Sequence, residues 1–133
     1  IPVMGHIGLT PQFVHQLGGF KVQGKSNESS TRLKAQALEL QEAGCFALVL
    51  EGMPRALAKE ITELLHIPTI GIGAGPDTSG QVLVWHDLLG LNLDFKPKFA
   101  QCFVDGQELF KAGVNSFIQA VNSGVFPSDE HCY

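Results

Sequence analysis

Residues 46–76 read FALVLEGMPRALAKEITELLHIPTIGIGAGP, and this stretch decides the fold. It opens with the apolar run 46–50, which ends at Glu51, and it closes with a second apolar run, 69–72, which ends among glycines. Continuous apolar runs of this length are typical of strands that are buried on both faces. Between them, Pro54 opens a segment with apolar residues at helical spacing. The stretch therefore predicts a strand, a helix and a second strand.

The same alternation continues on both sides of this stretch. Residues 1–4 (IPVM) form an apolar run that ends at Gly5 and His6, and residues 82–85 (VLVW) form another that ends at His86 and Asp87. Each run predicts a further strand. The order of strand, helix, strand, helix, strand, loop, strand and helix indicates parallel strands joined by right-handed crossovers. We therefore expect an α/β fold.

Capping residues and glycines indicate where the helices begin and end. The three predicted helices run from the capping residues 26–30 to Gly44, from Pro54 to just before Pro68, and from Asp105 to Gly124. Their apolar faces comprise Leu33, Ala37 and Leu40 in the first, Leu57, Ile61, Leu64 and Leu65 in the second, and Phe110, Val114, Phe117, Ile118 and Val121 in the third. We expect an irregular tail from Phe126 onward.

The composition narrows the class of protein. The chain has 133 residues, of which 44% are hydrophobic and 17% charged, which suits one domain or part of one. A formal charge of −4 argues against binding to nucleic acid or to an anionic membrane. No apolar run approaches the roughly 20 residues of a membrane span and no leader opens the chain, so we expect a soluble, cytoplasmic protein. The three cysteines, Cys45, Cys102 and Cys132, are expected to be free thiols.

Ligands bind at the carboxyl ends of parallel strands, so the residues that follow each strand are the site candidates. They are His6, Glu51, Gly71, Gly73, Gly75, and His86 with Asp87. Glu51 has the strongest claim, because a carboxylate that directly follows five apolar residues is poorly solvated, which raises its pKa toward the range of a general base. The alternative is structural, since a glutamate at a strand end can also cap a helix or pair with an arginine.

The other candidates each have a structural alternative. His6 can be a buried histidine bonded to a carbonyl, and the glycines can simply form tight turns rather than approach a small anionic ligand. The glycine run is not a dinucleotide fingerprint, because its sixth position is Pro76 and no amphipathic helix follows directly. His86 and Asp87 favour a structural pair over a metal site, because no third ligand lies at a suitable spacing. The cations Lys21, Lys25, Arg32 and Lys34 are solvated charges or contacts for an acidic cosubstrate.

Several blocks of sequence together resemble one enzyme family. They are residues 2–12 (PVMGHIGLTPQ), 19–24 (GFKVQG), 47–51 (ALVLE), 67–75 (IPTIGIGAG) and 80–90 (GQVLVWHDLLG), followed by the closing residues 126–131 (FPSDEH). In this order they resemble the ketopantoate hydroxymethyltransferase (3-methyl-2-oxobutanoate hydroxymethyltransferase) family, and the resemblance extends over essentially the whole chain. It implies that residues 1–133 are one segment, the carboxyl-terminal half (strands five to eight) of a (β/α)8 TIM barrel of the phosphoenolpyruvate/pyruvate superfamily.

The resemblance also implies a reaction and the roles of particular residues. A base removes the C3 proton of 3-methyl-2-oxobutanoate, and the enolate takes a one-carbon unit from 5,10-methylenetetrahydrofolate to give 2-dehydropantoate for pantothenate synthesis. Glu51 matches the base, His6 matches a histidine that lines the same cavity, and Gly71 and Gly73 belong to its wall. The family uses Mg²⁺ held by residues of the amino-terminal half, so no metal ligand is expected in this chain. Gly52 departs from the cysteine that many members carry after the base.

Two kinds of function remain open at this point. In the first, the chain acts as part of a hydroxymethyltransferase once the amino-terminal half of the barrel is supplied, within a homodecamer, as the resemblance implies. In the second, it is a non-catalytic half-barrel in which Glu51 has no role. A related metal-dependent lyase or aldolase acting on another 2-oxoacid is a further alternative. A half-barrel exposes strand edges and an apolar sheet face, so we expect it to associate with a partner.

Overall fold

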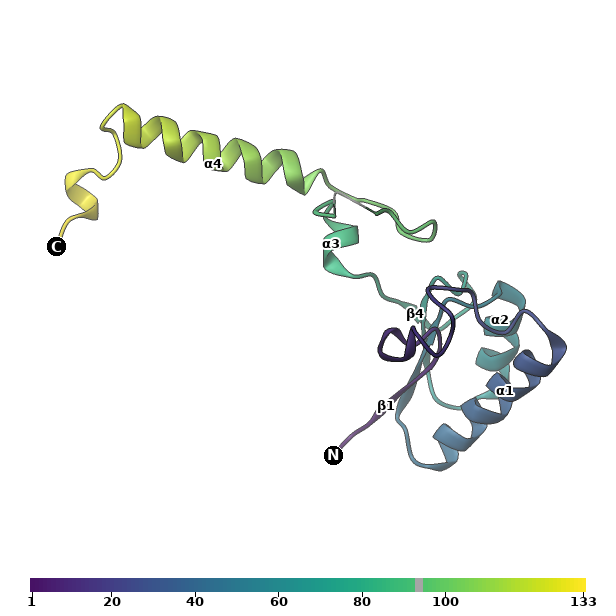
Figure 1. Ribbon diagram of the computed structural model, residues 1–133. Coiled ribbons are helices and arrows are strands. Elements are labelled where there is room, and N and C mark those ends of the chain that lie inside the picture. Colours follow the sequence, from purple (N-terminus) through teal and green to yellow (C-terminus); the bar gives the residue numbers. More distant parts are fainter. Residues whose placement is uncertain (93–94) are drawn as a thin grey trace. The chain divides into compact units, whose positions relative to one another are not determined.

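The computed structural model describes residues 1–92 and 95–133 of the chain. They form two compact units, residues Ile1–Leu83 and Val84–Tyr133 (Figure 1). We call them the amino-terminal unit and the carboxyl-terminal unit. In the part of the chain that is described, no helix has the length and the apolar character needed to cross a membrane.

The amino-terminal unit is built on a four-stranded parallel sheet. The strands are β1 (Met4–Gly8), β2 (Ala47–Glu51), β3 (Thr69–Ile72) and the short β4 (Gly80–Gln81). They lie in the order of the sequence, β1-β2-β3-β4, and every neighbouring pair is parallel. This arrangement confirms the α/β class that the alternation of strands and helices predicted.

Helices α1 (Asn27–Glu42) and α2 (Arg55–Leu64) form the connections between the first three strands and cover one face of the sheet (Figure 1). α1 begins at Ser26, whose hydroxyl accepts from the Ser29 N–H at 3.2 Å, while the Ser29 hydroxyl accepts from the Ser26 N–H. The core between the helices and the sheet is closed: Leu48 and Leu50 of β2 and Ile61 of α2 are completely buried. The single turn of 3-10 helix, η1 (Pro11–Phe13), follows β1.

The two faces of the sheet differ because side chains alternate along a strand. Ile7 and Leu50 are in register and point into the core. On the opposite face, His6 is in register with Val49, and Gly8 is in register with Glu51. α1 and α2 leave this second face open, so Val49 and Glu51 remain partly accessible and His6 is exposed.

The carboxyl-terminal unit contains α3 (Trp85–Leu88), α4 (Gly106–Asn122) and a 3-10 turn, η2 (Asp129–His131). α4 begins at Asp105, whose carboxylate accepts from the Glu108 N–H at 3.2 Å, as the capping pattern predicted. Its predicted apolar face is present but exposed: Phe110 is 63% exposed and Val114 is 58% exposed. This unit has no closed core of its own among its described residues, where only Ala100 and Gly106 are buried.

Three details differ from the sequence prediction. The first strand is Met4–Gly8 rather than residues 1–4, because pairing with β2 begins at Met4 and leaves Ile1 fully exposed. The predicted strand at 82–85 is wrong: β4 ends at Gln81, and the Val84 carbonyl accepts from the Leu88 N–H to open α3. The tail is not wholly irregular, because η2 forms within it. The three cysteines are free thiols, as predicted.

Candidate active site

Glu51 is the last residue of β2, and because side chains alternate it lies on the opposite face from the buried Leu50, the face that α1 and α2 do not cover. Its side chain is only 14% exposed, although it stands at a strand end. Burial of a carboxylate penalises the charged form, and this desolvation raises the pKa of Glu51 above its ordinary value. The geometry therefore gives Glu51 the poorly solvated environment that its position after five apolar residues predicted.

His6 is the partner of Glu51. Its Nε2 lies 2.9 Å from Oε2 of Glu51, and the imidazole is 34% exposed. The charge and the hydrogen bond of His6 both lower the pKa of Glu51, and they partly offset the larger effect of burial. His6 is not beyond the end of its strand, as we predicted, but in the middle of β1, two residues before Gly8. Its partner is a carboxylate rather than a carbonyl, and Glu51 pairs with a histidine rather than an arginine.

Gly8 allows the backbone of β1 to approach the backbone of Glu51 closely. It stands opposite Glu51 in the register and has a φ of +93°, a conformation that favours glycine. A Cβ at this position would lie 2.1 Å from the Glu51 carbonyl oxygen, so no larger residue fits without a backbone shift. The same carbonyl accepts from the Leu9 N–H at 2.8 Å. The chain after β1 is thus held directly against the end of β2.

The residue after Glu51 is fixed by two further hydrogen bonds. The Gly52 N–H donates to the Ile72 carbonyl of β3 at 2.9 Å, and the Gly52 carbonyl accepts from the Gln23 N–H at 2.8 Å. Gly52 has a φ of +57°, so the chain turns sharply directly after the carboxylate. Contacts to three different segments therefore hold the backbone at Glu51 and fix the direction from which its side chain leaves the strand.

The two glycines predicted to form the cavity wall do not occupy equivalent places: Gly71 lies within β3 and Gly73 follows it. Gly71 is in register with Leu50, so it belongs to the face covered by the helices and not to the face that carries Glu51 and His6. A Cβ on Gly71 would lie 2.6 Å from Thr78 Oγ1. Gly73 follows β3 directly and has a φ of +61°, at the same end of the sheet as Glu51. The two glycines thus lie in different surroundings, and only Gly73 shares the strand-end position of Glu51.

His86 and Asp87 lie in α3 of the carboxyl-terminal unit. The Trp85 ring contacts the His86 ring edge-on with centroids 4.7 Å apart, and the Asn92 amide donates to Asp87 at 3.4 Å. Together with Cys102 and neighbouring residues they line a small cavity of about 210 Å³. No hydrogen bond joins His86 to Asp87 within the described part of the chain, so each side chain has a different neighbour.

A comparison with known protein families matches residues 1–129 to the family described as ketopantoate hydroxymethyltransferase. The chain belongs to this family. A relative from Legionella pneumophila, 3-methyl-2-oxobutanoate hydroxymethyltransferase, is 57% identical over all 133 residues of the chain and 51% of its own length. A relative of the same name from Francisella tularensis is 52% identical over the whole chain and 50% of its own length. The chain thus spans about half the length of the curated hydroxymethyltransferases that it matches.

The described residues of this family member do not form a metal site by themselves. No group of three or more His, Cys, Asp or Glu side chains that could hold a metal lies within residues 1–92 and 95–133. Mg²⁺ prefers several oxygen ligands in octahedral geometry, whereas Glu51 contributes one carboxylate whose near neighbour is an imidazole. Within the described residues, Glu51 and His6 therefore do not make up a magnesium site by themselves.

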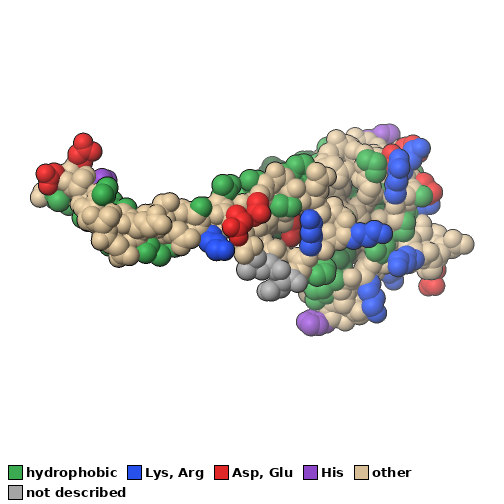
Figure 2. Space-filling view, turned by 90° about the horizontal axis from the view of Figure 1, so that it is seen from above, with side chains coloured by type: hydrophobic (Ala, Val, Ile, Leu, Met, Phe, Trp, Pro, Cys, Tyr) green, Lys and Arg blue, Asp and Glu red, His purple; other side chains and the backbone are tan. Residues whose placement is uncertain are grey.

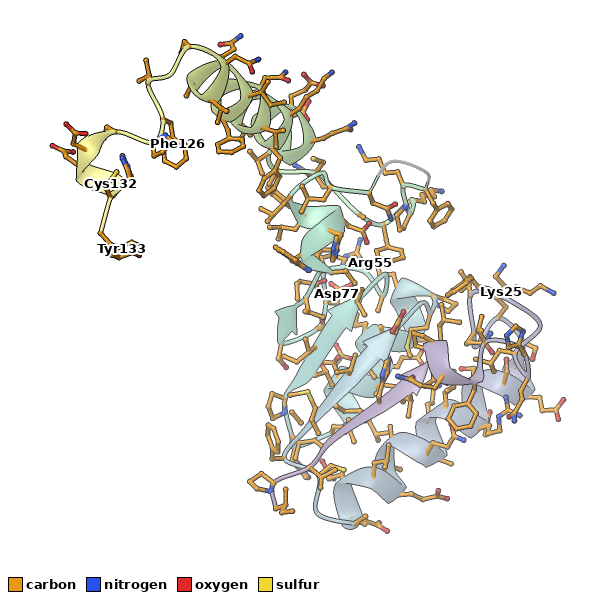
Figure 3. All side chains as sticks on the ribbon, turned by 60° about the vertical axis from the view of Figure 1, so that its left-hand side comes forward. Lys25, Arg55, Asp77, Phe126, Cys132 and Tyr133 are labelled. Carbon is orange, nitrogen blue, oxygen red and sulfur yellow. The ribbon has the colours of Figure 1, made fainter. Side chains whose placement is uncertain are left out.

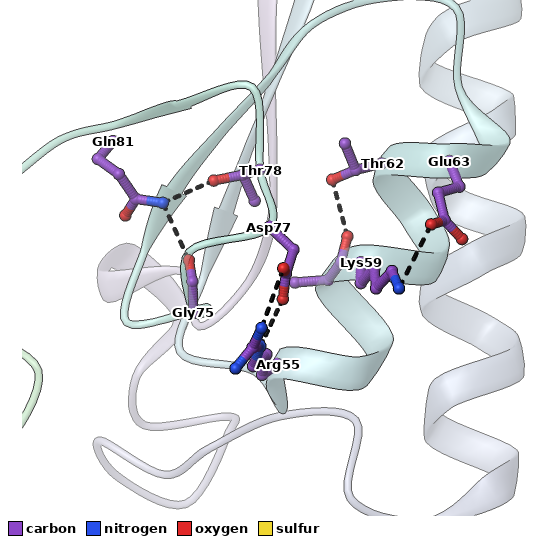
Figure 4. Close-up of polar contacts among 9 residues, drawn as sticks. Arg55, Lys59, Thr62, Glu63, Gly75, Asp77, Thr78 and Gln81 are labelled. Carbon is purple, nitrogen blue, oxygen red and sulfur yellow. Dashed lines mark hydrogen bonds and ion pairs between the residues drawn. The ribbon is translucent and has the colours of Figure 1, made fainter.

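A second polar cluster, which the sequence did not predict, joins the start of α2 to the segment after β3 (Figure 4). Arg55, at the start of α2, binds Asp77 through Nε at 2.5 Å and Nη2 at 3.1 Å, and this pairing lowers the pKa of Asp77. Gln81 donates to the Gly75 carbonyl at 2.9 Å and to Thr78 at 2.8 Å. The Arg55–Asp77 pair ties the start of α2 to the loop after β3, and the Gln81 contacts hold that loop against β4. Opposite charges 22 residues apart were the one available signal.

A cavity of about 570 Å³ lies along β1. Its wall includes His6 and Ile7 of β1, Leu33 and Leu40 of α1, and Phe13 of η1. β1 is an edge strand, since β2 is its one partner in the described sheet. Polar residues, among them Gln36 and Glu39 of α1, line it as well. A hollow beside an unpaired strand edge is a surface that another strand and helix can fill.

Proposed function

We propose that this chain provides the base of a 3-methyl-2-oxobutanoate hydroxymethyltransferase, and that Glu51 is the proton acceptor. The observation that carries this proposal is the Glu51 carboxylate, which is mostly buried at the carboxyl end of β2 and is bonded to His6. The relatives that match the whole chain bear the name of this activity.

In the proposed reaction, Glu51 removes the C3 proton of 3-methyl-2-oxobutanoate. The electron pair of the broken C–H bond forms the enolate, which attacks the one-carbon unit of 5,10-methylenetetrahydrofolate. With one water consumed, the products are 2-dehydropantoate and tetrahydrofolate. A C–H next to a ketone is a weak acid, so its removal needs a base with a raised pKa. Burial gives Glu51 that property.

His6 has a positioning role in this proposal. Burial alone would favour the protonated carboxyl, which cannot accept a proton, and the contact with His6 opposes this effect. The imidazole also fixes the direction of Oε2, while Oε1 has no such partner within the described residues. The second oxygen is therefore the one that we assign to the substrate proton. Gly73 at the end of β3 forms part of the wall, whereas the position of Gly71 suits a role in packing.

We further propose that residues 1–133 form the carboxyl-terminal half of a (β/α)8 barrel. The length match to half of each relative, the parallel sheet and the open face that carries His6 and Glu51 support this assignment. The other half would cover the edge of β1 and close the cavity beside it. Mg²⁺, which polarises the oxo group of the substrate when bound, would take its ligands from that half. Cytoplasmic location and homodecamer formation are parts of the same proposal.

The test uses a chimera in which this chain replaces the matching half of the Legionella pneumophila relative. We expect the chimera to form 2-dehydropantoate and to exchange the C3 proton of the oxoacid with solvent. Glu51→Gln should abolish exchange and leave binding of the oxoacid largely intact, because the amide keeps the shape but accepts no proton. Glu42→Gln, on the exposed end of α1, is the matched control and should exchange at the parental rate. Exchange at the parental rate in Glu51→Gln would remove Glu51 from the mechanism.

A further inference from the structure

One connection of the amino-terminal unit, the β3–β4 loop, is held from two sides. It comprises residues 73–79 (GAGPDTS) and begins with Gly73, at the carboxyl end of β3. From the side of β4, the Gln81 amide donates to the Gly75 carbonyl at 2.9 Å and to the Thr78 hydroxyl at 2.8 Å. From the other side, the first residue of α2 holds the loop (Figure 4).

Arg55, the first residue of α2, contacts the loop with both parts of its side chain. The methylene stem lies so close to Gly75 that an added Cβ there would be 2.7 Å from Arg55 Cγ. The guanidinium donates to the Asp77 carboxylate through Nε at 2.5 Å and through Nη2 at 3.1 Å. A two-pronged contact of this kind fixes the direction of both side chains as well as their distance. The position of the loop is thus coupled to the start of α2.

The ion pair joins two connections that leave the sheet side by side. Glu51 and Ile72, the last residues of β2 and β3, are in register, and the Gly52 N–H donates to the Ile72 carbonyl at 2.9 Å. Arg55 follows Glu51 by one short turn of chain, so the hydrogen bond and the ion pair link the same two connections at successive points. Figure 3 shows Arg55 and Asp77 together at the end of the sheet to which the strand arrows point.

We propose that Arg55 and Asp77 are positioning residues for the 2-oxoacid, and that their ion pair holds the β3–β4 loop where Gly73 forms part of the wall beside Glu51. This inference rests on the proposed function. The backbone of Glu51 is held by a hydrogen bond from the Leu9 N–H, which does not involve the pair. Loss of the pair should therefore loosen the wall and leave the proposed base in place.

The strength of an exposed ion pair limits the size of the effect. Arg55 is exposed and Asp77 is partly exposed, and pairs of this kind change an equilibrium by up to about fivefold. When a ligand binds only one arrangement of a loop, its apparent affinity falls with the fraction of molecules in that arrangement. We therefore expect removal of the pair to raise the KM for the oxoacid by about two- to fivefold.

The test measures C3 proton exchange in the chimera as a function of the concentration of 3-methyl-2-oxobutanoate. Arg55→Met keeps a stem against Gly75 but removes the guanidinium, and Asp77→Ala removes the carboxylate. Each should raise the KM, while the maximal exchange rate and its pH midpoint stay at the parental values, because the contact between Glu51 and His6 is unchanged. The double variant should have no larger effect than either single variant, because both substitutions remove the same contact.

The direction of the two changes separates positioning from a general effect of charge. Figure 2, a view from above, shows Lys and Arg side chains gathered over the amino-terminal unit, and such a field attracts an anionic substrate. If Arg55 acted only through this field, Arg55→Met would raise the KM and Asp77→Ala would lower it. Positioning of the loop requires that both substitutions raise it.

The matched control removes a cation from a different ion pair between two elements. Lys34→Met breaks the pair of Lys34 with Glu60, which joins α1 to α2, and should leave the KM near the parental value. Thermal unfolding of each variant measures the folded fraction, because a purely structural pair would change the amount of active enzyme and leave the KM as it was.

Three results would overturn the positioning role and leave the proposed function intact, provided that the chimera exchanges the proton normally. They are opposite shifts of the KM in Arg55→Met and Asp77→Ala, an unchanged KM in both, and a loss of activity that only follows the folded fraction. Absence of exchange in the unaltered chimera would instead overturn the proposed function, and the positioning role with it.

Discussion

The two units of the chain differ in how far their apolar side chains are buried. In the amino-terminal unit, Leu48, Leu50 and Ile61 are completely buried between the sheet and its helices. In the carboxyl-terminal unit, α4 carries an equally clear apolar face, yet Phe117 is 55% exposed and Ile118 is 47% exposed. The same periodicity of sequence therefore gives a packed core in one unit and an uncovered helix face in the other.

This difference shows what an amphipathic pattern does and does not specify. The pattern determines which face of a helix needs cover, whereas the cover itself depends on what lies within reach. In the amino-terminal unit the sheet supplies it, and the buried core then fixes the strand ends that carry Glu51. Matched substitutions in the two units should therefore have different effects on stability.

The largest effect is expected from truncation in the core. Ile61→Ala in α2 should lower the free energy of unfolding of the amino-terminal unit by about 2–5 kcal/mol, because it removes fully buried methyl groups and leaves a cavity. Ile118→Ala in α4 should cost less than about 1 kcal/mol in the isolated chain, because that side chain is half exposed. Urea unfolding followed by hydrogen exchange, resolved by unit, measures both. Equal losses would show that α4 is packed as tightly as α2.

Replacement of a glycine by alanine should change the free energy of unfolding in opposite directions in the two units. Gly24→Ala should destabilise the amino-terminal unit by about 1–3 kcal/mol, since it strains a positive φ and places a Cβ against Leu57. Gly113→Ala should stabilise α4 by about 1 kcal/mol, because the site is helical, nothing lies near the added Cβ, and alanine is the better helix former. Thermal unfolding followed by circular dichroism distinguishes the two signs, and a loss of stability in Gly113→Ala would contradict the open surroundings of that residue.

Helix caps should have intermediate and similar effects. Ser26→Ala removes the hydroxyl that caps α1, and Asp105→Ala removes the carboxylate that caps α4. Each should cost about 1 kcal/mol, because a backbone N–H loses its partner in both cases. The same unfolding measurements apply, with Ser116→Ala on α4 as a control that removes a hydroxyl away from any cap. A much larger loss for Ser26 than for Asp105 would show that packing of α1 depends on its first turn.

The smallest effect concerns pH. Because burial raises the pKa of Glu51 in the folded protein, the folded state binds this proton more tightly than the unfolded chain does. The free energy of unfolding of the amino-terminal unit should therefore fall as pH rises from the ordinary pKa of a glutamic acid through the raised pKa of Glu51. Glu51→Gln should remove this decline, and the carboxyl-terminal unit should not show it. Stability that rises with pH in that window and is unchanged by Glu51→Gln would contradict the assigned direction.

Local patterns predicted the elements that have strong local signals. Residues 69–72 are a strand as expected, and Ser26 and Asp105 cap helices where the capping residues indicated. The run 82–85 misled because an apolar run becomes a strand only where another strand pairs with it: β4 ends at Gln81, and Val82, Val84 and Trp85 are exposed. β1 begins three residues later and ends four residues later than predicted for the same reason, since its ends depend on the strand beside it.

The site was predictable only in part. Glu51 stood out because it follows an apolar run, but its contact with His6 depends on the register that sets Gly8 opposite Glu51. A register cannot be read from either strand alone, so we placed His6 after its strand rather than within it. The Arg55–Asp77 pair was missed because the two side chains meet through a loop of irregular backbone.

The role of the Glu51 carboxylate as the proposed base, with a pKa set by burial and by His6, can be measured in the chimera. The decisive experiment is the pH dependence of C3 proton exchange. Exchange should appear as pH rises through a midpoint above the ordinary pKa of a glutamic acid, and His6→Gln should move that midpoint to higher pH, because His6 lowers the pKa of Glu51. An identical midpoint in the parent and in His6→Gln, or exchange that persists in Glu51→Gln, would contradict the account.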